Sequence, residues 1–84
     1  MEDWREKLIL RGGEKLQHTG SRMTGSLQET DIDTYDVVDA DGAKTGTVTV
    51  EDHTAIRGFA RTITVCQQDA SGKAIVEESW KVRS

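Results

Sequence analysis

The sequence has a single cysteine, Cys66, so it can form no internal disulfide and carries no sign of an oxidising compartment. It also lacks any apolar stretch long enough to cross a membrane. The apolar run at residues 8–10 lies in a segment of mixed charges, which argues against a secretory signal peptide. Together these absences indicate a cytoplasmic protein.

Apolar and aromatic residues are scarce, at 35% and 5% of the chain, whereas charged residues reach 31%. The 84 residues have room for one domain, residues 1–84, with a modest core. A chain of this length buries roughly two-thirds of the surface that its unfolded form exposes. Marginal stability, or help from self-association, is therefore expected, and a homodimer formed through an edge strand stays open.

Histidine and cysteine, which are common zinc ligands, are also few. His18, His53 and Cys66 are the full set of histidines and cysteines, and they show no paired spacing. A triad could nominally combine Cys66 and His53 with an aspartate, but no motif brings them together. We therefore predict a protein that is not an enzyme, uses no cofactor and has no zinc site, and we assign no residue as a metal ligand.

What the chain does contain is two segments of alternating apolar and polar residues, each folded back at a glycine. In the first, a two-residue turn at Asp41-Gly42 would set Tyr35 opposite Val48 and Val37 opposite Gly46. This register gathers the apolar residues on one side of the hairpin. A slip by one residue would move all of them to solvent, so turn and pattern support each other.

The second segment turns at Ser71-Gly72, which would set Ile63 opposite Trp80 and Val65 opposite Glu78. Arg61 and Glu78 fall on the apolar side and are exceptions to the pattern. The chain is thus predicted to be mainly β, a small antiparallel meander of two hairpins at about Tyr35-Asp52 and Phe59-Val82. Its inner face comprises Tyr35, Val37, Val48, Val50, Ile63, Val65, Val76 and Trp80.

The N-terminal third is ambiguous. Asp3 and Glu6 resemble a helix-capping pair, which favours a short helix and an α+β fold. Gly12-Gly13 is also a hairpin corner that would set Ile9 opposite Leu16, and we favour this further hairpin. Residues 19–30 are dense in glycine, serine and threonine, which indicates a loop or a bulged strand.

An acidic segment leads into the first hairpin. Between Gln28 and His53 there are eight acidic residues and one basic residue. A calcium loop with Gly42 at its sixth position would place Val37 and Val48 at ligand positions, so an EF-hand is excluded. A looser divalent-ion site and a solvated acidic edge both stay open. The candidate acidic face comprises Asp31, Asp33, Asp36, Asp39 and Asp41.

The net charge of −4 argues against general nucleic-acid binding, which rests on basic residues. Our leading hypothesis is a non-catalytic protein-interaction module whose acidic face meets a basic partner, in the manner of short bacterial or phage regulators and inhibitors. The alternative is a module that binds a small ligand or nucleic acid on its other side. That patch comprises His53, Arg57, Arg61, Glu78 and Trp80.

Overall fold

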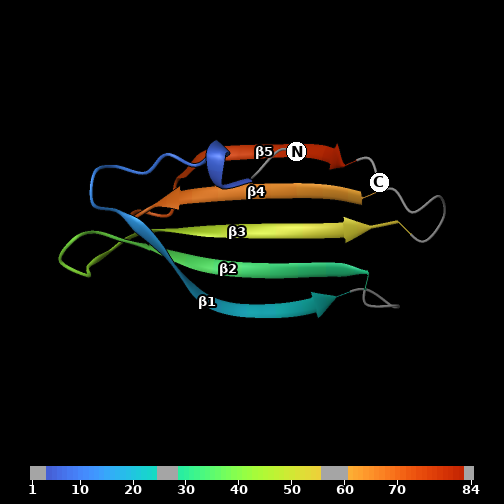
Figure 1. Cartoon of the computed structure of the whole chain (residues 1–84), viewed down its shortest axis with the longest axis horizontal. Coiled ribbons are helices and arrows are strands. Elements are labelled where there is room, and N and C mark those ends of the chain that lie inside the picture. Colours follow the sequence, from blue (N-terminus) through green and yellow to red (C-terminus); the bar gives the residue numbers. More distant parts are fainter. Residues whose placement is uncertain (1–3, 25–28, 56–60, 83–84) are drawn as a thin grey trace.

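A computed structural model describes residues 4–24, 29–55 and 61–82. The chain forms one five-stranded antiparallel sheet in the order β1-β2-β3-β4-β5, preceded by a single turn of 3₁₀ helix (Figure 1). The elements are η1 (Trp4–Lys7), β1 (Lys15–Thr24), β2 (Thr30–Val38), β3 (Lys44–Thr54), β4 (Arg61–Asp69) and β5 (Ala74–Val82). The predicted antiparallel meander is confirmed, with one more strand than the two predicted hairpins supply.

The predicted register of both hairpins is confirmed, but the predicted turns are wrong in detail. Tyr35 pairs with Val48, as predicted. The first loop is nevertheless three residues long, because Asp39 N donates to Ala43 O at 2.9 Å and Gly42 N donates to Asp39 O at 3.0 Å. Gly42 has a φ of 85°, so it occupies the left-handed position that ends such a loop.

A β-bulge explains why the predicted residue pairs form although the loop is one residue longer than predicted. Val38 pairs with Lys44, and Val37 pairs with Gly46, so one residue of β3 is extra between them. The same loop recurs at the second hairpin, where Asp69 N donates to Lys73 O and Gly72 N donates to Asp69 O. A register shift follows there as well, between positions 67 and 68. The bulge in each case returns the strands to the predicted pairing.

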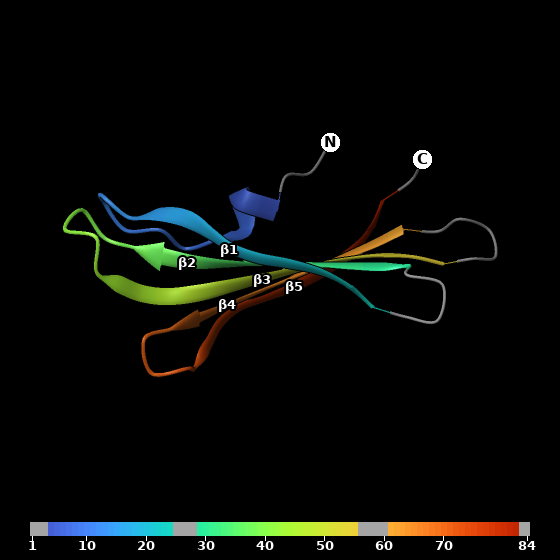
Figure 2. The same ribbon diagram turned by 90° about the horizontal axis from the view of Figure 1, so that it is seen from below.

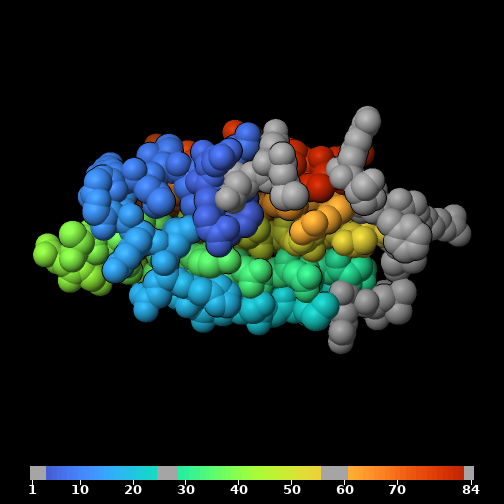
Figure 3. All heavy atoms as spheres, in the orientation of Figure 1, coloured from blue at the N-terminus to red at the C-terminus, as the bar shows by residue number. Residues whose placement is uncertain are grey.

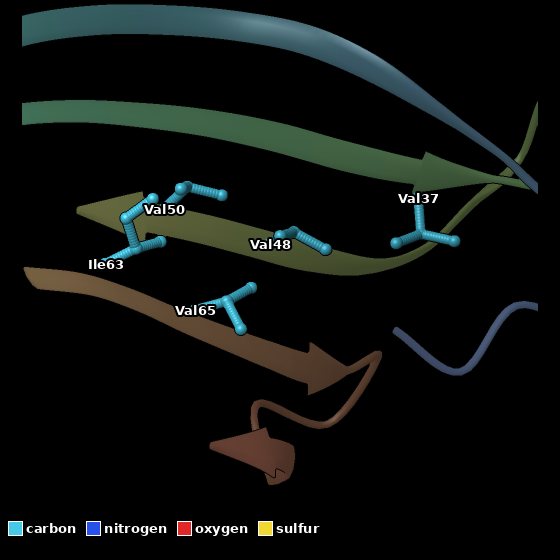
Figure 4. Close-up of a cluster of buried hydrophobic side chains, with 5 residues drawn as sticks. All are labelled: Val37, Val48, Val50, Ile63 and Val65. Atoms are coloured by element: carbon cyan, nitrogen blue, oxygen red, sulfur yellow. The ribbon is translucent and has the colours of Figure 1, made fainter. Parts of the chain in front are cut away.

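The largest cluster of buried side chains lies on one side of the sheet, which we call the covered face. Ile32 and Val38 are also buried but point to the other side of β2. All eight residues of the predicted inner face share the covered face, because side chains alternate along each strand and the strands are paired in register. Five of them form the central buried cluster: Val37, Val48, Val50, Ile63 and Val65 (Figure 4). Val76 is also buried, whereas Tyr35 and Trp80 are half-buried.

The N-terminal segment covers this face in place of the predicted hairpin. Trp4 and Leu8 pack against the core cluster, and the segment lies on one side of the sheet (Figure 2). Ile9 pairs with no strand; its N–H donates to Gln67 Oε1 and its C=O accepts from Gln67 Nε2, both at 2.8 Å. The hairpin prediction is thus wrong, and the helix alternative survives only as η1. Covering exposed apolar surface outweighs pairing with β1 here.

The loop predicted for residues 19–30 is wrong in its first part. β1 extends to Thr24, with a bulge between His18 and Gly20. The alternative prediction for this segment, a bulged strand, is therefore confirmed as far as Thr24. Residues 25–28 lie outside the described part, as does the predicted start of a strand at Phe59. Within the described residues, no helix has the length and apolar character needed to cross a membrane.

Candidate functional site

The five aspartates of the predicted acidic face do not share one face. β2 lies between β1 and β3, so the segment is not an edge of the sheet. Asp31 and Asp33 lie on the covered face with Tyr35, whereas Asp36 lies on the opposite, open face. Asp31 is exposed, and 38% of the Asp33 side chain is exposed. The acidic segment therefore divides into two groups with different surroundings.

The second group is engaged in the hairpin. Lys44 Nζ lies 3.4 Å from Asp36 Oδ1, so this carboxylate has a cationic neighbour. Asp39 Oδ1 accepts hydrogen bonds from the N–H groups of Asp41 and Ala43, both at 2.9 Å. Asp41 is exposed in the turn. Asp36 and Asp39 thus have partners within the hairpin and Asp41 lies in its exposed turn, whereas Asp31 and Asp33 lie together on the covered face.

A third carboxylate, which the sequence analysis missed, joins Asp31 and Asp33. Asp52 of β3 pairs directly with Asp31 of β2 on the covered face. Two like charges directly opposite each other on neighbouring strands repel and destabilise the sheet unless a cation lies close to them. The signal was present in the predicted register: extending it from Tyr35 and Val48 by four residues sets Asp31 opposite Asp52. We call Asp31, Asp33 and Asp52 the acidic patch.

Arg61 neutralises one member of this patch. Its Nε donates to Asp52 Oδ1 at 2.7 Å, and its Nη2 donates to Asp52 Oδ2. These hydrogen bonds, and then the charge of Asp52, raise the pKa of Arg61. The side chains are 47% and 27% exposed, so the pair contributes about 0–1 kcal/mol. Arg61 offsets the repulsion between Asp31 and Asp52 but leaves net negative charge.

The rest of the surroundings combine apolar and polar groups. Met23 of β1 pairs with Asp31 and is 55% exposed. His18 Nε2 lies 3.2 Å from Asp33 Oδ1, and its ring packs against Tyr35 with centroids 5.1 Å apart. In the space-filling view, the N-terminal segment lies across the upper strands and leaves the right-hand part of β1 and β2 in view (Figure 3). The acidic patch is accessible beside an exposed methionine.

The alternative patch is divided in the same way. Arg61, Glu78 and Trp80 lie on the covered face, as the register predicted, whereas His53 lies on the open face. His53 Nδ1 and Thr30 Oγ1 are 2.7 Å apart. Arg57 lies outside the described residues. The indole N–H of Trp80 is buried and meets no acceptor among the described residues.

A groove of about 450 Å³ lies where the turns meet, and no pattern in the sequence predicts it. Its wall brings together Ile9, Glu14, Thr45 and Asp69, which are remote in sequence. The Thr45 hydroxyl donates to Glu14 Oε2 at 2.6 Å, and this bond is the main reason that the pKa of Glu14 is lowered. The wall carries charges of both signs, with Arg11 and Lys44 beside Glu14 and Asp69.

Metal-binding groups are not clustered in the described part of the chain. No three histidine, cysteine, aspartate or glutamate side chains there are placed to hold an ion. Cys66 is half-buried on the open face, between Thr49 and Glu77 in cross-strand register. Comparisons with protein-family models, with curated proteins and with solved structures found no match to this chain.

Proposed function

We propose that this chain is a non-catalytic protein-interaction module that binds a basic surface of a partner protein through the acidic patch. The observation that carries the proposal is the alignment of Asp31, Asp33 and Asp52 on one accessible part of the sheet. Arg61 is paired with Asp52, so Asp31 and Asp33 carry most of the remaining negative charge. Clustered charge of one sign steers a partner of opposite charge and selects against partners of like charge.

Met23 supports an interface rather than a merely solvated acidic surface. Its side chain is exposed next to Asp31 in the same cross-strand row. Methionine is enriched in protein interfaces, where its unbranched side chain adapts to different shapes. A basic partner surface could thus contact carboxylates and an apolar group together. Occupying that surface would alter what the partner can bind, as expected of a small bacterial or phage regulator or inhibitor in the cytoplasm.

The test is capture of partner proteins from a lysate of the source cells by the immobilised protein, read by mass spectrometry. Asp31→Asn with Asp33→Asn should reduce capture of the main partner about tenfold at low salt, because two of three carboxylates are lost. The matched control, Asp36→Asn with Asp41→Asn, removes equal charge elsewhere and should leave capture unchanged. Equal capture by both folded variants would contradict the proposal.

The ligand-binding alternative has weaker support. Arg61 already donates two hydrogen bonds to Asp52, whose negative charge offsets the attraction of the guanidinium for a phosphate. Its test is titration with single-stranded oligonucleotides while the fluorescence of Trp80 and Trp4 is followed. A salt-dependent response that Arg61→Gln abolishes would favour this alternative over the acidic patch.

A further inference from the structure

The two edges of the sheet differ in how they are protected against pairing with another chain. β1 carries Lys15, His18 and Arg22 with no acidic residue, and it has a bulge in its middle. Positive charge and a bulge are two devices that block edge-to-edge pairing. β5, the other outer strand, runs without a register shift from Val76 to Val82 and carries both signs of charge (Figure 1). The open edge of β5 is therefore the better site for strand addition.

Every second residue of β5 directs its backbone polar groups to this open edge. The hydroxyls of Thr64 and Ser79 are 3.1 Å apart, which is typical of a cross-strand pair whose backbones are not bonded to each other. The N–H and C=O of Ser79 consequently point away from β4. Since the pattern alternates and the register is regular, the same holds for Glu77 and Lys81. These three residues supply the donors and acceptors for a further strand.

We propose that β5 pairs antiparallel with β5 of a second copy of this chain, about a two-fold axis at Ser79. In this register Glu77 lies opposite Lys81 of the second copy, and Lys81 lies opposite Glu77 of the second copy. Val76 and Val82 lie opposite each other on the covered face in the same way. All six outward-pointing residues of the two strands then meet partners, and both cross-strand ion pairs have opposite charges.

The charges of β5 favour this register over the alternative registers of the same two strands. An axis at Glu77, Glu78 or Lys81 would set two identical charges directly opposite each other, which destabilises a strand pair. An axis at Trp80 would set Ser79 opposite Lys81 and form neither ion pair. The Ser79 axis is the one that satisfies both ion pairs. It continues the sheet across the two copies and, with the two-fold perpendicular to the sheet, places both acidic patches on the same side.

The test is sedimentation equilibrium of the purified full-length protein over a concentration series. Lys81→Glu sets carboxylates opposite each other at two places and should raise the dimer Kd about tenfold or more. Combining Glu77→Lys with Lys81→Glu inverts both pairs and should restore the original Kd. Arg22→Glu makes the same charge change on β1 and should leave the Kd unchanged.

A backbone variant provides an independent measurement. Ser79→Pro removes an N–H that points to the second copy, so the dimer should dissociate while the β4–β5 ladder and the circular dichroism spectrum persist. The proposal is overturned if the wild-type protein stays monomeric up to about 1 mM. It is equally overturned if Lys81→Glu has no effect on the Kd, or if the double charge reversal fails to restore it.

Discussion

Gln67 ties the N-terminal segment to the sheet, and replacing it gives the sharpest test of the fold. The residue lies in β4, is 3% exposed, and is the buried polar residue among the described core positions. Its amide binds both backbone groups of Ile9 at 2.8 Å, as a neighbouring strand would. The amide offers both a donor and an acceptor, whereas a charged carboxylate lacks the donor and an alkyl side chain lacks both.

Gln67→Leu removes both hydrogen bonds and leaves the N–H and C=O of Ile9 without protein partners. At about 0.5–1.5 kcal/mol for each net hydrogen bond, the loss is about 1–3 kcal/mol. Both bonds are only partly buried, so water can bond to the freed backbone groups of Ile9 and offset part of this loss. We therefore expect a loss of stability near the lower end of that range. For a native protein, whose total stability is typically about 5–15 kcal/mol, this is a large change.

Gln67→Glu should make the stability of the protein depend on pH, in a direction that the structure predicts. The introduced carboxylate accepts from Ile9 N–H but is repelled by Ile9 C=O, and burial disfavours its charged form, so its pKa rises in the folded state. When protonated, it can donate to Ile9 C=O as glutamine does. The destabilisation should therefore be smallest below the ordinary glutamate pKa of about 4.3 and grow as pH rises through the elevated pKa.

Urea unfolding at pH 4 and pH 7, followed by far-ultraviolet circular dichroism and by tryptophan fluorescence, measures both effects. Trp4 packs against Tyr35 with ring centroids 5.1 Å apart, so release of the N-terminal segment alone would change fluorescence before the sheet signal. Gln68→Leu, at the exposed neighbouring position, is the control and should change stability by less than about 0.5 kcal/mol. A Gln67→Leu variant as stable as the wild type, or a Gln67→Glu variant whose stability relative to the wild type does not change with pH, would contradict this role of the Gln67 amide.

Two further predictions concern the sheet and its turns. A Cβ at Gly46 would lie 2.4 Å from the backbone oxygen of Gln68, so Gly46→Ala should cost about 1–3 kcal/mol in urea unfolding, whereas Gly12→Ala, with open space, should be near neutral. Equal stabilities would contradict this steric argument. The pKa of Asp69 is lowered from 3.8, mainly because the Ser71 hydroxyl donates a hydrogen bond to its carboxylate. The ionised carboxylate therefore stabilises the folded state above about pH 4, and this stabilisation is lost as the pH falls further. Thermal unfolding between pH 5 and pH 2.5 should show a shallower decline for Asp69→Asn, and identical slopes would refute the assignment.

Much of the sheet followed from local signals. Alternation in β2 to β5, together with a glycine at each corner, specified which residues share a face, and Tyr35–Val48 and Ile63–Trp80 pair as predicted. The predicted turn type was wrong because the loop has three residues instead of two. The extra residue of β3 in the bulge then brings the strands back to the predicted register, so both turns give the same pairs. Sequence spacing alone cannot distinguish these two solutions.

The candidate site was half predicted. Asp31 and Asp33 were identified from the acidic run, but Asp39 was assigned to a surface although its carboxylate holds a turn. Asp52 was missed because it lies 21 positions after Asp31 and becomes its neighbour only through strand pairing. A run of charges in sequence does not predict a charged surface, since alternate residues of a strand point to opposite faces.

The sequence by itself determined the fold class, the register of two hairpins and the apolar face, because these depend on alternation and on glycine at the turns. Only the tertiary structure decided how that face is covered. The choice between a hairpin and a segment crossing the sheet depends on contacts such as Trp4 with Tyr35 and Ile9 with Gln67. These pairs lie far apart in the chain, so their free energy leaves no trace in local periodicity. Asp52 differs from these contacts, because the predicted pairing of Tyr35 with Val48, extended by four residues, already sets it opposite Asp31.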